Sequence, residues 1–429
     1  MTENSICDMT EQHMKLLSKC NSGTEEAPYK IKKKKEAAAY PSCGLSSLPD
    51  AVVLSCLARV SKLDHPALSM VSKRYRSLMV SSELYDLRSS SMGRTENLLY
   101  VCLRTPPDPT LLWFVHTPTT RLVQIPLLPY MPWQESSVVL LNHGIYVIGG
   151  IVNGKPSSGV FLLDCRAHKW SQVPSMRAAR APAITGVVNG KIYVVGGCGH
   201  KYSSEWAEVF DPKMETWETL SVPEDVFFTF CLSRHCMVMD DKIYAVSQFS
   251  ETICYSPGND KWEQGSRDLA GGVKRGWCVV GKLLYSCHVS GTVLWCEPMD
   301  LEKSNPFTWK EVKGLESLQN QLSSSRMVHH VWGYNSPTLG FSNEFEDQVP
   351  GFKLCNSGRN ILLYWDVLVG GFETLEIWCA EISLERRTTG GGGGGDDDIW
   401  GTVLSSNVVM TLDPLLYRFK ALYSLSVKV

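Results

Sequence analysis

The chain has 429 residues, of which 44% are hydrophobic and 20% are charged, and its formal net charge at pH 7 is -2. This length and composition suffice for a large apolar core and two domains, and the balanced charge excludes a general attraction to nucleic acid or to anionic membranes. No apolar run reaches the roughly 18 residues of a membrane-spanning helix, and the polar start lacks the apolar segment of a secretory signal. We therefore expect a protein of the cytoplasm, the nucleus or both.

Fifteen cysteines are scattered along the chain without a C-x-x-C pair. An odd and scattered set indicates neither a disulfide framework nor a zinc ribbon. We expect most of these cysteines to be small buried hydrophobic side chains, and we predict no metal and no cofactor.

Residues 1–42 have the composition of a disordered lead-in and include a lysine-rich tract at Lys30 and residues 32–35. Such a tract occurs in nuclear-import signals and, more simply, in solvated linkers. The simpler interpretation is favoured here.

Residues 45–87 carry the spacing of short amphipathic helices. Pro49 suits the first turn of a helix, where the missing N–H costs nothing, and Asp50 complements the positive end of the helix dipole. A second apolar stripe restarts near Asp64 and Pro66, and a third short element follows. The apolar positions that recur every three or four residues are Val53, Leu57 and Val60, then Leu68, Val71, Tyr75 and Leu78. The third short element would contain Leu84, Tyr85 and Leu87.

The order of residues within 43–90 closely resembles the F-box: Leu-Pro-Asp at 48–50, a Leu-rich helix, Leu-Ser-Met-Val-Ser-Lys-Arg-Tyr-Arg-Ser-Leu at 68–78, and Glu-Leu-Tyr at 83–85. The resemblance implies a three-helix module that binds a Skp-type adaptor protein and, through it, a cullin scaffold. The sequence does not separate positions that fill the module's own core from those that contact the adaptor. A generic helical hairpin packed on the rest of the protein is the alternative. The motif's hydrophobic positions correspond to Leu48, Pro49, Leu54, Leu57, Leu68, Val71 and Leu78.

Two later segments repeat with a period of 47 residues. The glycine pairs at 149–150 and 196–197 keep this spacing, and so do Trp170 and Trp217. Each unit reads as four strands, in which the paired glycines let the backbone turn where a Cβ would clash and the repeated Tyr and Trp side chains pack between sheets. The pattern resembles the kelch motif, whose units form the blades of a β-propeller. The repeat positions are Gly149, Gly150, Trp170, Gly196, Gly197 and Trp217, with Trp262, Trp309 and Trp400 in weaker copies.

Counting the weaker copies gives six units, so the sequence predicts a small N-terminal all-α module followed by an all-β, six-bladed kelch-type propeller over residues 95–429. We expect an insertion around residues 319–350 and a flexible inter-strand loop in the low-complexity run 388–398. The alternating residues 421–427 supply an inner strand that the first unit lacks and close the ring. The predicted units are 95–132, 137–176, 181–222, 230–268, 273–315 and 327–405, and the closing strand is 417–429.

The joint order of these parts, together with residues 376–387 and 399–401, resembles the plant-type F-box/kelch-repeat family. The resemblance implies the substrate-recognition subunit of a Skp, cullin and F-box ubiquitin ligase, in which the propeller binds a protein target. Such a subunit is not an enzyme and contributes proximity and orientation. The insertion departs from the family's pattern, and so do two weaker copies, which have Ser247-Gln248 and Cys287-His288 in place of the glycine pair. These departures leave the geometry of blades four to six open. A propeller scaffold that acts independently of ubiquitination is the alternative.

An enzyme is the least favoured class. An oxidase built on a kelch propeller needs His and Tyr ligands around one channel, and no such cluster stands out. Residues 198–200 and 231–236 contain Cys and His without a partner set, and no phosphate-binding loop or nucleophile elbow is present. Arg177 and Arg180, between the second and third units, are the candidates for target contacts, although kelch units often carry arginine here for packing.

Overall fold

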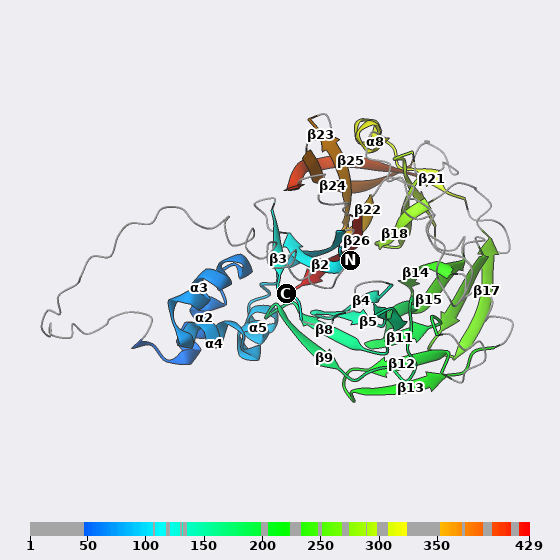
Figure 1. Ribbon diagram of the computed structural model, residues 1–429. Helices are drawn as coiled ribbons and strands as arrows, with labels where there is room; N and C mark the ends of the chain where they lie inside the picture. Colours follow the sequence, from blue (N-terminus) through cyan, green and yellow to red (C-terminus); the bar gives the residue numbers. More distant parts are fainter. Residues whose placement is uncertain are drawn as a thin grey trace, which may run out of the picture. The chain divides into compact units, whose positions relative to one another are not determined.

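The computed structural model describes most of the chain from residue 47 onward (Figure 1). The chain divides into two units, residues 1–49 and residues 50–429. The predicted lead-in at 1–42 lies outside the described residues, as do residues 324–350 of the expected insertion and 389–396 of the expected loop. The described ranges are 47–105, 108–116, 121–128, 131, 135–198, 205–223, 233–247, 251–267, 274–288, 290–297, 308–323, 352–370, 374–388, 397–412 and 420–429.

A helical module occupies residues 50–91. Its elements are α2 (Asp50–Leu57), the 3-10 turn η2 (Lys62–Asp64), α3 (His65–Val71), α4 (Lys73–Met79), α5 (Ser82–Asp86) and the π-helical turn η3 (Leu87–Ser91). The module has a core of its own, because the apolar stripes of its helices face one another. This core consists of Val53, Leu54, Leu57, Ala58, Tyr75, Leu78, Met79 and Leu84.

The second apolar stripe is divided between two helices, α3 and α4. Ser72 adopts an extended backbone (φ -157°, ψ 160°), and its hydroxyl accepts a hydrogen bond from the Tyr75 N–H at 3.1 Å. A serine in this position caps the following helix, which ends α3 at Val71 and lets α4 leave at a new angle. The apolar spacing alone does not reveal the break, because it continues across Ser72.

Six four-stranded antiparallel sheets follow in the described part of the chain and confirm the predicted six-bladed propeller (Figure 1). The first strands of the six sheets lie beside one another around the ring. In sheet order, blade 1 contains β26 (Lys420–Lys428), β1 (Asn97–Thr105), β2 (Asp108–His116) and β3 (Leu122–Ile125); blade 2 contains β4 (Ser137–Leu141), β5 (Gly144–Ile148), β8 (Val160–Asp164) and β9 (Lys169–Val173).

The remaining blades follow the chain without crossovers. Blade 3 contains β10 (Ile184–Val188), β11 (Lys191–Val195), β12 (Ala207–Asp211) and β13 (Thr216–Leu220); blade 4 contains β14 (Ser233–Met239), β15 (Lys242–Ser247), β16 (Glu251–Ser256) and β17 (Lys261–Arg267). Blade 5 contains β18 (Lys274–Val280), β19 (Leu283–His288), β20 (Val293–Cys296) and β21 (Lys310–Glu311); blade 6 contains β22 (Lys353–Ser357), β23 (Asn360–Val369), β24 (Thr374–Thr388) and β25 (Asp397–Leu412). A small hairpin, β6 (Ile151–Val152) and β7 (Lys155–Pro156), extends blade 2, and α8 (Glu316–Ser323) follows blade 5.

Strand β26 closes the ring. It pairs antiparallel with β1 and places Leu425 opposite Tyr100. Val427 of this strand is fully buried, in a cluster that also contains Tyr100 and Trp113 of blade 1. The inner strand of blade 1 therefore comes from more than 300 residues later in the chain than the strand beside it, and β1 has no open edge.

One glycine of each pair occupies a position where a Cβ would clash with the backbone of another segment. Gly149 and Gly197 have φ of +62° and +73°. A Cβ at Gly149 would lie 2.5 Å from the Arg180 carbonyl oxygen, and one at Gly197 would lie 2.1 Å from the Pro182 carbonyl oxygen. Each pair thus lets the segment that links blades 2 and 3 cross directly over the end of a strand.

The repeat tryptophans tie neighbouring blades together. The Trp217 Nε1–H donates to the Pro174 carbonyl at 2.8 Å, and the Trp262 Nε1–H donates to the Ser221 carbonyl at 3.1 Å. Both acceptors follow the last strand of the preceding blade. Trp170 and Trp217 are also buried, so each such ring seals the junction between two sheets.

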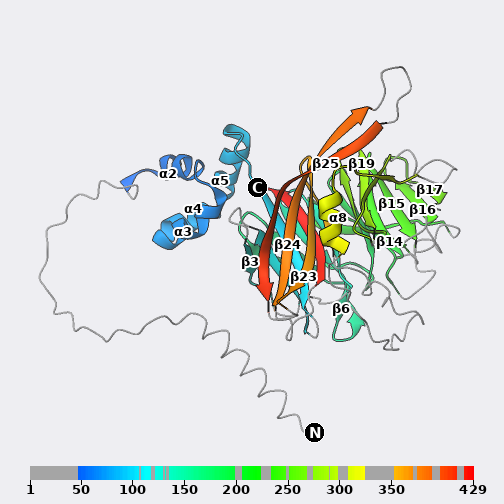
Figure 2. The same ribbon diagram turned by 90° about the horizontal axis from the view of Figure 1, so that it is seen from above.

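Blade 6 departs from the expected register. The strand pairings place Ser406, and not Trp400, at the position that corresponds to Trp217 in blade 3. Trp400 instead pairs with Glu385, beyond the end of β23. The assignment of Trp400 as the repeat tryptophan is therefore wrong, because much of the additional length continues β24 and β25 as a long hairpin. Figure 2 shows the end of this hairpin projecting from the propeller.

The projecting hairpin is anchored to the segment that leads into α8. The Lys313 N–H donates to the Ile399 carbonyl at 2.9 Å, and the Gly401 N–H donates to the Lys313 carbonyl at 2.8 Å. Leu315 packs so closely on Gly401 that a Cβ there would lie 2.9 Å from its side chain. These contacts join blades 5 and 6 beside the predicted insertion.

We expect Gly197→Ala to destabilise the propeller more than Gly190→Ala does. The two glycines have nearly equal positive φ, +73° and +74°, but an added Cβ meets backbone only at Gly197. Both variants incur the left-handed strain of about 1 kcal/mol, and Gly197→Ala incurs a further steric cost of about 1 to 3 kcal/mol. Urea unfolding measures the difference. Equal midpoints in the two variants would contradict the close backbone approach.

Candidate protein-interaction site

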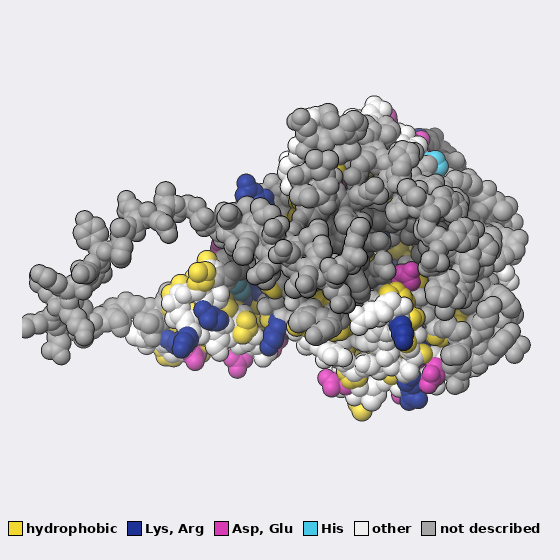
Figure 3. Space-filling view, in the orientation of Figure 1, with side chains coloured by type: hydrophobic (Ala, Val, Ile, Leu, Met, Phe, Trp, Pro, Cys, Tyr) yellow, Lys and Arg dark blue, Asp and Glu magenta, His cyan; other side chains and the backbone are white. Residues whose placement is uncertain are grey.

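Apolar side chains are exposed on the helical module although its core is filled. In the described residues, eight large hydrophobic side chains are exposed, and five of them lie between residues 48 and 80. Met70 is 81% exposed and Val71 66%, and Val80 and Val52 are also open to solvent. Figure 3 shows hydrophobic side chains on this part of the surface, interspersed with charged ones. We therefore take these exposed apolar side chains as the candidate protein-interaction site.

The structure divides the predicted adaptor contacts into two groups. Leu54, Leu57 and Leu78 are buried in the module's core, so they are unavailable to a partner, and Leu68 packs partly against that core. The exposed members are Leu48, Pro49 and Val71.

Sequence periodicity missed Val52, Met70 and Val80 as exposed apolar residues. Val52 and Val80 each stand next to a buried apolar residue, Val53 and Met79 respectively, whereas Met70 stands next to Val71, which is exposed as well. A short helix with two adjacent apolar residues turns about 100° between them and cannot bury both equally well. These doublets were the available signal.

One ion pair at the surface of the module links two of its helices. The Arg74 guanidinium pairs with Asp50 at 2.6 Å and so links the start of α4 to the start of α2. Both side chains are solvent-accessible, so this ion pair contributes at most about 1 kcal/mol. Lys73 and Arg76 are exposed on the same helix.

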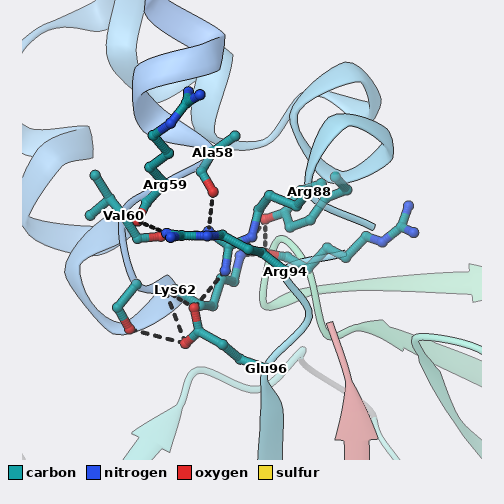
Figure 4. A network of polar contacts seen from close by, with 10 residues as sticks. Ala58, Arg59, Val60, Lys62, Arg88, Arg94 and Glu96 are labelled. Atoms are coloured by element: carbon teal, nitrogen blue, oxygen red, sulfur yellow. Dashed lines mark hydrogen bonds and ion pairs between the residues drawn. The ribbon is translucent and has the colours of Figure 1, made fainter. Parts of the chain in front are cut away.

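A polar network lies where the helical module meets blade 1 (Figure 4). Arg88 Nη1 donates to the Ala58 carbonyl at 3.1 Å, and Arg88 Nη2 pairs with the Glu96 carboxylate at 2.5 Å. Burial acts to raise the pKa of Glu96, but hydrogen bonds from the Lys62 N–H, Ser61 and Arg88 together lower that pKa below its ordinary value. Glu96 therefore stays ionised and bonded near neutral pH.

Lys62 lies beside this network and reaches blade 2. Its ammonium donates to the Tyr85 hydroxyl and to the carbonyl of Arg166, in the turn between β8 and β9. Burial lowers the pKa of Lys62 to about 8. The Arg166 guanidinium lies 5.1 Å from the centre of the Tyr85 ring, so cation–π contact also holds this turn to the module.

Arg180 is not a target contact, because it is fully buried in the propeller. Its guanidinium pairs with the equally buried Glu208 at 2.7 Å and donates to the Gly196 carbonyl at 2.6 Å. The other oxygen of Glu208 accepts the Arg177 N–H at 2.7 Å. Arg180 thus holds the segment that links blades 2 and 3 against blade 3. The prediction that Arg180 contacts a target is therefore wrong.

Arg177 is exposed and stays a prediction for target binding. Its segment lies at the same end of the blades as the connections between second and third strands. Several of those connections lie outside the described residues, including 199–204, 248–250 and 371–373. In the described parts of the chain, no group of three His, Cys, Asp or Glu side chains is placed to hold a metal ion, and no helix is long and apolar enough to cross a membrane.

Comparison with known proteins agrees with this architecture. The F-box domain model matches residues 45–87, and the model described as FKB95, Kelch-repeats domain, matches residues 101–410. Among relatives from Arabidopsis thaliana, one putative F-box/kelch-repeat protein is 38% identical over 95% of this chain and 100% of its own length. Another putative F-box/kelch-repeat protein is 34% identical over 83% of this chain and 87% of its own length, and an F-box/kelch-repeat protein is 34% identical over 89% and 93%.

The fold and the matches together define an F-box module joined to a kelch propeller. The chain belongs to the F-box/kelch-repeat family.

We expect Arg180→Ala to destabilise the protein by about 3 to 5 kcal/mol, because it leaves the Glu208 carboxylate buried without its partner. The exposed Arg177→Ala is the matched control and should change stability by no more than about 0.5 kcal/mol. Urea unfolding of the two variants at neutral pH tests this. Similar losses in both variants would show that Arg180 has no special structural role.

We expect acid to weaken the helical module through His65. Burial, together with the nearby positive charges of Lys62 and Arg88, lowers the pKa of His65 from 6.5 to about 4. The unfolded chain takes up a proton near pH 6.5 and the folded module only near pH 4, so stability is lost as the pH falls through this window. The loss from this side chain is about 1 to 2 kcal/mol at pH 5.

The measurement is urea unfolding at pH 7 and pH 5, followed by helical circular dichroism. His65→Leu should reduce the difference between the two pH values, whereas Met214→Leu, a substitution of an exposed side chain that does not titrate, should not change it. An unchanged difference in His65→Leu would exclude His65 as the source.

Proposed function

We propose that the protein is a non-catalytic substrate-recognition subunit of a Skp, cullin and F-box ubiquitin ligase. In this proposal the helical module binds a Skp-type adaptor and, through it, the cullin scaffold. The propeller binds a protein target and presents it to the ubiquitin-loaded enzyme. Membership of the F-box/kelch-repeat family supports the proposal.

The observation that carries the proposal is the exposure of Val52, Met70, Val71 and Val80 on a module whose core is already complete. Exposed apolar side chains are costly in an isolated protein and are stabilised when a partner covers them. A helical module that served only to pack on the propeller would bury these residues against it. Leu48 and Pro49, which are exposed, stay in the predicted adaptor contacts.

A Skp-type adaptor should bind the purified chain, and Val71→Asp should weaken that binding at least about tenfold, because a charge enters an apolar interface. Met214→Asp is the matched control, since Met214 is 71% exposed on blade 3. A pull-down and a calorimetric titration measure both variants, with the Leu48→Ala/Pro49→Ala double variant as a further test. Absence of binding by the unaltered chain would reject the ligase-subunit proposal.

A propeller scaffold independent of ubiquitin is the second function that the family's propeller supports. The two are separated by reconstituting the chain with adaptor, cullin and ubiquitin-loaded enzyme in the presence of a protein captured by the propeller. Transfer of ubiquitin to that protein supports the receptor. Capture without transfer, in a complex whose adaptor is bound, supports the scaffold.

A further inference from the structure

One carboxylate, Glu96, bonds to two segments of the helical module. It lies immediately before β1 and accepts a hydrogen bond from the Ser61 hydroxyl at 3.0 Å and another from the Lys62 N–H at 3.0 Å. It also forms the ion pair with Arg88 (Figure 4). Three donors thus converge on one side chain, from the turn after α2 and from η3.

Arg88 extends this connection to the end of α2. Its side chain is only 3% exposed, and besides pairing with Glu96 it donates to the carbonyls of Ala58 and Val60. These carbonyls follow the last turn of α2, where backbone acceptors have no partner within the helix. Arg94, which follows η3, donates from Nη1 to the Arg59 carbonyl at 2.9 Å, so a second arginine side chain reaches the same turn.

The backbone of Glu96 is fixed by a different part of the chain. Its N–H donates to the Val429 carbonyl at 2.8 Å, and its carbonyl accepts the Val429 N–H at 2.9 Å. This pair of hydrogen bonds continues the pairing of β1 with the closing strand β26. The position of the Glu96 carboxylate therefore depends on β26 being in place.

We propose that Glu96 is a positioning residue that fastens the helical module to the closed propeller, and that docking of β26 sets the orientation of the module through it. The backbone of Glu96 is bonded to the propeller, and its carboxylate makes three polar bonds to the helical module. These two attachments together resist rotation of the module. The consequence for the ligase rests on the proposed function: the fastened joint would fix the direction in which the adaptor-binding surface faces relative to the propeller.

Hydrogen exchange of the full chain, read by mass spectrometry, tests the fastening. Glu96→Gln keeps the size of the side chain but removes its charge and one acceptor oxygen. The Lys62 amide and the amides of residues 88–94 should then exchange at least about tenfold faster, because charge-assisted hydrogen bonds are lost. Peptides from β5 and β11 should be unchanged. Glu263→Gln, which breaks an exposed ion pair with Lys261 in blade 4, is the control and should change none of these peptides.

Small-angle scattering supplies a readout that a purely stabilising role would not move. Glu96→Gln should broaden the distribution of interatomic distances while the urea midpoint of the propeller stays at the unaltered value. Unchanged scattering together with unchanged exchange at Lys62 would overturn the proposal.

The dependence on β26 is tested in the unaltered chain, where misfolding of a variant plays no part. In exchange measured at increasing, non-denaturing urea concentrations, the Lys62 amide and the amides of β26 should open in one cooperative step. If the Lys62 amide remains protected while β26 opens, the coupling to ring closure is rejected.

The adaptor pull-down separates this proposal from the proposed function. Glu96→Gln leaves the exposed apolar residues intact, so it should bind a Skp-type adaptor as the unaltered chain does. If the unaltered chain binds no adaptor, the ligase proposal fails, whereas the exchange and scattering results still decide whether Glu96 fastens the module.

Discussion

The pairing of β26 with β1 is the interaction on which the rest of the structure depends. Each blade packs on two neighbours, so a ring in which one sheet lacks its inner strand exposes apolar surface on both sides of the gap. Val427 fills that gap between blades and lies in one cluster with Trp113 and Trp170. The pairing also joins segments more than 300 residues apart, so its loop-closure entropy must be offset by the packing of all six blades together.

Ring closure also bears on the helical module, because the module is attached at the point where the ring closes. The module fills its own core with Leu57, Leu78 and their neighbours and leaves Met70 and Val71 in solvent. Its exposed apolar residues are therefore free of the propeller, while its polar residues Lys62 and Arg88 hold it in place. The exposed apolar residues and the polar contacts of the attachment are therefore different side chains.

The blade number was predictable because the repeat is enforced at particular atoms. A glycine is needed at position 197 because a Cβ there would clash with the Pro182 carbonyl. A tryptophan is favoured at position 217 because its Nε1–H donates to the preceding blade. Such constraints recur at a fixed spacing and are visible in the sequence. Trp400 was misplaced because spacing does not distinguish a longer loop from longer strands; only the register, with Ser406 opposite Ala380, shows that the strands lengthened.

The site was less predictable because its residues are defined by partners far away in the chain. Arg180 is buried whereas Arg177 is exposed, because Arg180 pairs with Glu208, about 30 residues later in the chain. Glu96 does not belong to any periodic pattern that would single it out. Apolar contacts alone would attach the module without fixing its angle, since they are non-directional and tolerate sliding. Hydrogen bonds require a narrow range of distances and angles. A junction that must hold one orientation is therefore served by a carboxylate with three donors, and such a junction leaves little trace in hydrophobic periodicity.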